Sequence, residues 1–169
     1  RQDAIKAFTS ADENNFFRGV AAGTTFGKFA FTGFYSLKNR DANITDTLST
    51  GRICFSSFQE SGYHRTASET SDENSLREQA IGGNLVFRNN FLKAGSTLVY
   101  YQFDKYRITG DELKDNYDFE GNKLLNWGID YSFSIRKIQL FGETSYGNHF
   151  WATLNGMLLH VNKYASFSL

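Results

Sequence analysis

The chain has 169 residues and no formal net charge, because 18 Lys and Arg balance 18 Asp and Glu. Its basic residues are also scattered along the sequence, which argues against a nucleic-acid partner. Cys54 is the only cysteine, so disulfides within the chain and a cysteine-based zinc site are excluded. No run of about 18 apolar residues occurs, and the sequence therefore predicts no transmembrane helix.

Aromatic residues and the absence of proline favour an all-β chain. Phe and Tyr number 17 and 9, and there is no proline. Since proline cannot donate to a β-ladder, its absence suits a chain made mostly of paired strands. The chain starts at Arg1 without an apolar targeting segment, so we expect a mature protein or a fragment. Residues Arg1–Asn15 have no regular period and lead into the first predicted hairpin.

Four hairpins are predicted in chain order, because strand-like runs are joined in pairs by very short turns. Their arms are Phe16–Thr24 with Lys28–Lys38, Glu78–Arg88 with Leu92–Asp104, Leu125–Ile135 with Ile138–Tyr146, and Trp151–Val161 with Tyr164–Leu169.

The clearest pattern runs from Leu125 to Ile135, where every odd position is apolar and every even position is small or polar. A period of two predicts a β-strand with two chemically different faces. Its length matches the ~9–11 residues that a tilted strand needs to cross a bilayer. From this pattern the predicted membrane-facing residues are Phe29, Phe31, Tyr35, Trp127, Ile129, Tyr131, Phe133 and Leu140.

The opposite faces carry polar side chains that would point into the interior of a barrel. Opposite charges across a narrow barrel normally form compensating pairs, and a polar permeation path is the alternative interpretation. The lumen-facing candidates are Lys28, Lys38, Glu78, Arg88, Asp130, Gln139 and Glu143. Six basic residues should gather at the rim that carries the short turns, where headgroup phosphates or snorkelling would suit them: Lys28, Arg88, Lys93, Arg136, Lys137 and Lys163.

The connections between hairpins are longer and polar. Residues 39–75 are predicted to form a long extracellular loop region, in which Ile53–Glu60 is a candidate short strand or hairpin arm. Short turns at one end and long loops at the other are typical of outer-membrane barrels.

Three segments, FFRGVAAGTTFGKFAFTGFYSLKNRDANI, SSFQESGYHRTASE and EQAIGGNLVFRNNFLKAGSTLVYYQFDK, resemble outer-membrane β-barrel proteins of Bacteroidota-type Gram-negative bacteria. The resemblance is compositional and covers most of the chain. It implies a closed barrel in the bacterial outer membrane and carries over no active residue.

We therefore expect residues 1–169 to form a single all-β domain, an antiparallel up-and-down transmembrane β-barrel of about eight strands or part of a larger barrel. The expected role is a non-enzymatic pore, transport component or structural member of an envelope complex. Membrane lipid and other outer-membrane proteins are the expected partners, and no cofactor is expected. Two alternatives are a soluble β-sandwich binding module and a barrel-embedded hydrolase, the latter suggested by His64 and Ser68.

One acidic loop offers oxygen ligands for calcium. The candidate residues are Asp111, Asp115, Asp118 and Glu120, but their spacing does not match an EF-hand, and a solvated loop is the expectation. His149 and His160 have no paired spacing for a metal, so no metal site is predicted.

Overall fold

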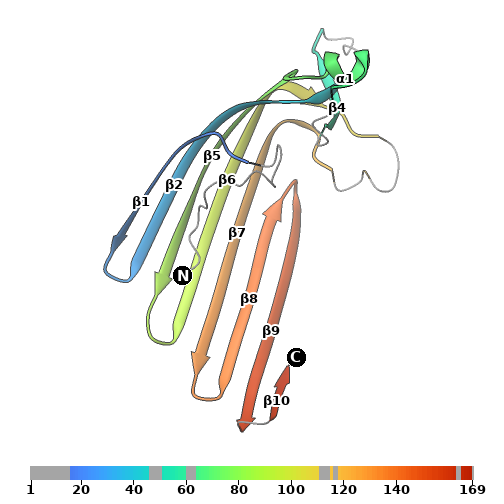
Figure 1. Cartoon of the computed structure of the whole chain (residues 1–169). Helices are drawn as coiled ribbons and strands as arrows, with labels where there is room; N and C mark the ends of the chain where they lie inside the picture. Colours follow the sequence, from blue (N-terminus) through green and yellow to red (C-terminus); the bar gives the residue numbers. More distant parts are fainter. Residues whose placement is uncertain are drawn as a thin grey trace.

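In the computed structural model, residues 16–45, 51–59, 64–110, 115, 118–162 and 165–168 are described. They form an antiparallel meander in which the strands lie in the order β1-β2-β5-β6-β7-β8-β9-β10 (Figure 1). The strand bounds are β1 Gly19–Phe26, β2 Phe29–Arg40, β3 Ala42–Thr45, β4 Cys54–Phe58, β5 Leu76–Arg88, β6 Leu92–Arg107, β7 Gly121–Ile135, β8 Ile138–Gly147, β9 Phe150–Asn162 and β10 Ala165–Ser168, and the one described helix is α1 Ala67–Ser71.

The four predicted hairpins are confirmed as antiparallel neighbours, with shifted ends. The turn at Arg136 and Lys137 lies where it was predicted. The first turn lies instead at Gly27 and Lys28, because Gly27 adopts a φ of 58°, which a glycine reaches at no steric cost. β6 continues to Arg107, beyond the predicted end at Asp104.

The region 39–75, predicted as a loop, contains regular structure. β3 and β4 form a short antiparallel hairpin, and β4 also pairs with the end of β6 in parallel. The candidate strand at Ile53–Glu60 is thus confirmed by β4. Helix α1 begins after Thr66, whose side chain accepts a hydrogen bond from the backbone of Glu69 while the Glu69 side chain bonds back, a capping box.

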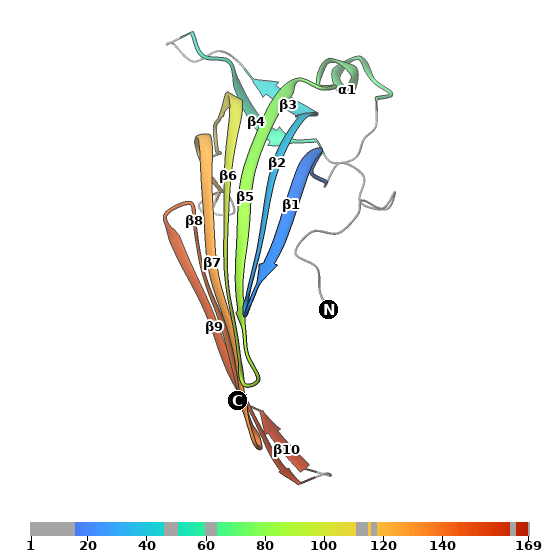
Figure 2. The ribbon, with the colours of Figure 1, turned by 90° about the vertical axis from the view of Figure 1, so that its left-hand side faces the viewer.

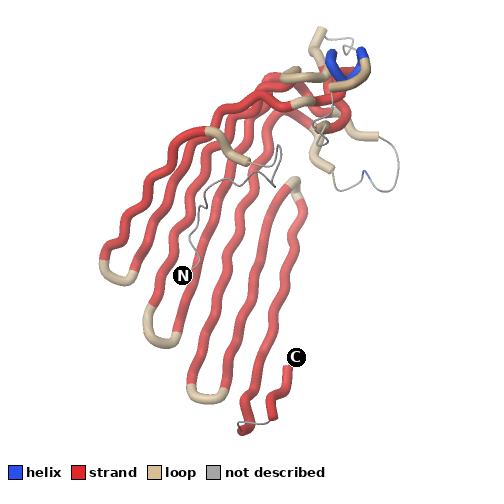
Figure 3. Tube along the Cα trace, in the orientation of Figure 1, coloured by secondary structure: helices blue, strands red, loops and turns tan. Residues whose placement is uncertain are grey.

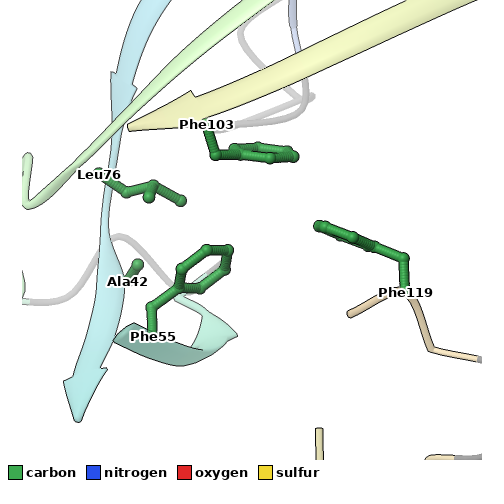
Figure 4. Packing of buried hydrophobic residues seen from close by; sticks show 5 residues of the cluster. All are labelled: Ala42, Phe55, Leu76, Phe103 and Phe119. Atoms are coloured by element: carbon green, nitrogen blue, oxygen red, sulfur yellow. The ribbon is translucent and has the colours of Figure 1, made fainter. Parts of the chain in front are cut away.

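The buried core lies where this β3–β4 hairpin folds over one end of the sheet. Its members come from β3, β4, β5, β6 and the segment before β7, and Figure 4 shows their side chains converging. The Phe103 ring lies 6.0 Å from that of Phe55 and 5.4 Å from that of Phe119, between centroids. The core residues are Ala42, Phe55, Leu76, Phe103 and Phe119.

Elsewhere the described residues form a single curved layer that is not closed (Figure 2). β1 and β10 are the ends of the strand order, and no ladder joins them. The short turns step steadily down one end of the sheet (Figure 3). For example, Phe29 is the first residue after the first turn and pairs with Phe87. β5 continues past Phe87 to Arg88, and the next turn begins at Asn89, so the second turn lies farther down than the first. A stagger of about one residue per strand corresponds to a strand tilt of about 35°, given a rise of about 3.3 Å and a spacing of about 4.8 Å.

Candidate membrane-facing surface and inward charge cluster

The ladder register assigns every strand residue to one of two faces, because directly paired residues project to the same side. Tyr35 pairs with Ile81, Ile81 with Tyr100, and Tyr100 with Leu125, so apolar side chains continue from strand to strand. We call this side the apolar face. The register places all eight predicted membrane-facing residues on it: Phe29, Phe31, Tyr35, Trp127, Ile129, Tyr131, Phe133 and Leu140. Whether it contacts lipid remains a prediction.

The side chains of the apolar face are exposed, and the apolar residues stop abruptly at one end of the sheet. Ile81, for example, is 55% exposed, and Leu85 is 44% exposed. At the end that carries the β3–β4 hairpin, the face changes to polar side chains, where Gln79 pairs with Gln102 and Gln102 with Lys123. The other limit is the row of short turns. Between these limits the band is about nine to eleven residues tall on β2, β6 and β7.

Different aromatic residues mark the two limits of this band. Near the short turns the rings are phenylalanines, and Phe29 lies 5.7 Å from Phe26 and 5.1 Å from Phe87 between centroids. Near the other limit they are Tyr and Trp, with Trp151 packing against Trp127 at 6.0 Å and Tyr146 at 4.9 Å.

Polar groups within the apolar band bond to one another. The Tyr131 hydroxyl donates to Asn155 Oδ1 at 2.9 Å, and the Thr144 and Thr153 hydroxyls lie 3.0 Å apart. Such pairing removes the cost of leaving these groups without partners in an apolar medium.

The other side, which we call the polar face, carries the predicted lumen-facing residues of the strands. Lys38, Glu78, Arg88, Asp130, Gln139 and Glu143 all project to it, while Lys28 lies in the first turn. The β3–β4 hairpin and the core cover this face at one end, since Leu76 and Phe103 belong to it. Apolar side chains also occur here on β8 and β9, with Phe141 and the 68% exposed Leu154 among them.

A buried charge cluster lies on the polar face beside the core. The Glu78 side chain is only 3% exposed, and its carboxylate accepts a hydrogen bond from Arg40 at 3.1 Å and lies 3.8 Å from Lys38 Nζ. Lys38 Nζ also donates to the backbone carbonyl of Phe16 at 2.7 Å. Buried charges of this kind persist only when they are paired. Lys38 and Glu78 were predicted from the sequence for this face, whereas Arg40 was not, although its period-two spacing from Lys38 places it on the same face.

Two like charges meet farther along the same face. Asp130 pairs directly with Glu143 across β7 and β8, and neither takes part in an ion pair of the described residues. Like charges directly opposite are destabilising unless water solvates them. A shallow hollow of about 300 Å³ lies alongside, and both polar residues such as Thr97 and Ser145 and apolar ones such as Val99 line it.

The loop residues considered for chemistry have structural partners. His64 Nε2 lies 3.0 Å from Asp41 Oδ2, a partner 23 positions away that was not predicted from the sequence, while the Asn74 backbone N–H donates to the other oxygen of Asp41. Ser68 lies in α1, and its carbonyl accepts from Ser71. In the described parts of the chain, no hydrogen bond joins His64 to Ser68.

The calcium candidates are only partly within the described residues. Asp111 lies outside them, Asp118 receives a hydrogen bond from Arg107, and Glu120 is exposed. Asp115 accepts a backbone hydrogen bond from Asp118. Over the residues that can be placed, no group of three or more His, Cys, Asp or Glu side chains is arranged to hold a metal ion.

Comparisons with protein-family models, curated proteins and solved structures found no match. None of the helical residues that the structure describes forms a segment long and apolar enough to cross a membrane.

Proposed function

We propose that this chain is part of a transmembrane β-barrel of a bacterial outer membrane, with the apolar face against lipid and the polar face toward the interior. Its role is that of a pore, a transport component or a structural member of an envelope complex. The observation that carries the proposal is the exposed, predominantly apolar band that continues across β2, β5, β6, β7, β8 and β9.

The dimensions of this band support a bilayer as its environment. Nine residues at about 3.3 Å each, tilted by about 35°, span about 25 Å, which is the height of the apolar band on outer-membrane barrels. Rings bound the band at both limits, as interfacial girdles do, with Trp127, Tyr146 and Trp151 at one limit. A water-soluble sheet with so much exposed apolar surface would be prone to association.

The open edges support membership of a larger barrel. In hydrocarbon every backbone donor and acceptor needs a partner, so the outer edges of β1 and β10 require further strands. Successive short turns are offset in the same direction across the sheet, and such an offset is the shear that a closing sheet needs. We infer that the further strands and the strands described here belong to one closed sheet.

The residues of the polar face support a barrel interior that contains water in one part and packed protein in another. Asp130 and Glu143 need water, whereas the β3–β4 hairpin and the Lys38–Arg40–Glu78 cluster close one end of the face. A barrel with this interior would be narrowed at the end that carries the long connections.

Membrane fractionation with a heat-modifiability assay tests this function. We expect the intact protein to require detergent for extraction and to migrate differently on a gel with and without boiling, since closed barrels resist unfolding in the detergent. Release into buffer without detergent would refute the proposal and favour a β-sandwich, in which a second sheet covers the apolar face.

A further inference from the structure

The three residues that precede β1 lie against the polar face of the sheet. The Arg18 backbone N–H donates to Ser36 Oγ at 2.9 Å, and the Leu37 backbone N–H donates to the Arg18 carbonyl at 2.9 Å. Lys38 Nζ donates to the Phe16 carbonyl at 2.7 Å. Since Ser36 and Lys38 both project to the polar face, these bonds hold the chain on that side. We call residues 16–18 the strap.

The Phe17 ring extends the strap across the sheet toward β6. Its centroid lies 4.6 Å from that of Phe34 on β2 and 6.4 Å from that of Tyr101 on β6. On β5, which lies between them, the polar-face residues paired with Tyr101 and Phe34 are the small residues Ala80 and Gly82. Because these residues are small, rings from β2 and β6 can contact a common third ring above β5.

Burial on the polar face differs from one part of the sheet to the other. Beside the strap, Ser36 and Ala80 are each 1% exposed. On β7 and β8, six successive polar-face residues are half-buried or exposed, and the hollow of about 300 Å³ lies among them. We call this surface the open lane, and its residues are Asn126, Gly128, Asp130, Glu143, Ser145 and Gly147.

The open lane is hydrophilic and carries no bulky side chain. Two of its residues are glycines, and the others offer amide, hydroxyl or carboxylate groups. Arg88 and Lys93 project to the same face nearer the short turns, so charges of both signs border the lane. Such a surface suits hydrated solutes in general and favours neither sign of charge.

We propose that the strap narrows the barrel interior beside β2, β5 and β6, and that small hydrophilic solutes pass along the open lane on β7 and β8. This inference rests on the proposed transmembrane barrel and adds a solute class and a route to it. The β3–β4 hairpin, the Lys38–Arg40–Glu78 cluster and the strap occupy successive levels of the polar face on β2, β5 and β6. The hollow lies on the other side of this packed region, where hydrated solutes find room.

Two neighbouring positions on β8 test the route. Ser145 faces the lane, whereas Thr144 pairs with Ile129 on the apolar face. The measurement is potassium chloride conductance of the intact protein in a planar bilayer, before and after a water-soluble methanethiosulfonate is added. We expect the reagent to lower the conductance of Ser145→Cys by about half and to leave Thr144→Cys unchanged. The wild type controls for the buried Cys54. No block in Ser145→Cys, or an equal block in both variants, would overturn the route.

A second pair of variants tests the strap. Phe17 and Phe31 are 51% and 45% exposed, but Phe17 lies on the polar face and Phe31 on the apolar face of β2. We expect Phe17→Ala to raise the conductance about 1.5-fold or more, and Phe31→Ala to leave it unchanged. Unchanged conductance in Phe17→Ala would refute the narrowing. A wild-type protein that needs detergent and is heat-modifiable, yet conducts no ions, would overturn this inference alone, whereas release into buffer would overturn the barrel itself.

Discussion

Arg40 and Glu78 join neighbouring strands at the edge of the buried core, with Arg40 donating to the Glu78 carboxylate at 3.1 Å. The two residues project to the same face, where Lys38 is the second cation beside Glu78. One nearly buried carboxylate therefore compensates two cations.

Replacing Glu78 should be costly, because Glu78→Gln leaves Lys38 and Arg40 without a compensating charge. We expect the free energy of unfolding to fall by about 3 kcal/mol or more. The control is Glu143→Gln, since Glu143 is exposed and faces Asp130, and a change within about 0.5 kcal/mol is expected there. Denaturant unfolding of the intact protein in detergent measures both. Equal effects would show that the cluster is not structurally important.

Two adjacent glycines should respond differently to alanine. A Cβ on Gly82 would lie 2.5 Å from the Phe34 ring and 2.9 Å from the Leu98 carbonyl oxygen, whereas at Gly83 the nearest atoms lie at 3.5 Å. We expect Gly82→Ala to lower the free energy of unfolding by about 1–3 kcal/mol, through displacement of the ring. Gly83→Ala should be neutral or stabilising by up to about 1 kcal/mol. The reverse order in thermal or denaturant unfolding would contradict the packing of Phe34 over Gly82.

The two faces of β5 should tolerate a charge unequally. Leu85 projects to the apolar face and Asn84 to the polar face, in the middle of the band. Leu85→Lys should cost about 2–4 kcal/mol of stability in a bilayer, because the ammonium group would enter hydrocarbon. Asn84→Lys should cost less, even though it removes the 2.8 Å hydrogen bond to Thr97. Reconstitution into vesicles under denaturant measures the difference, and equal tolerance would argue against lipid on the apolar face.

The cap of α1 should weaken in acid. Backbone hydrogen bonds from Arg65 and Thr66 to the Glu69 carboxylate lower the pKa of Glu69 below its ordinary value near 4.5. Because the pKa is lowered in the folded state, the stabilisation is complete above pH 4.5 and is lost as the pH falls through the lowered value. Hydrogen exchange at the Arg65 and Thr66 amides should accelerate in that range, after correction for intrinsic rates. In Glu69→Gln this pH dependence should vanish, and its persistence would assign the effect to another group.

The assignment of residues to the two faces could be predicted from the sequence, because side chains on a strand alternate with a period of two. The alternation around Trp127 and Ile129 assigned residues to faces, and the short polar turns identified which strands are neighbours. The first turn was displaced because a positive φ at Gly27 decided its position, and hydrophobic alternation does not report backbone dihedrals.

By itself, the sequence determined the β-class, the four hairpins and the division of residues between two faces, since all three follow from interactions between near neighbours. Tertiary structure alone decided the pairing of β4 with β6, the contact of His64 with Asp41 and the position of Arg40 beside Glu78. These contacts join segments far apart in the chain, and their formation depends on a register between hairpins that no local pattern specifies.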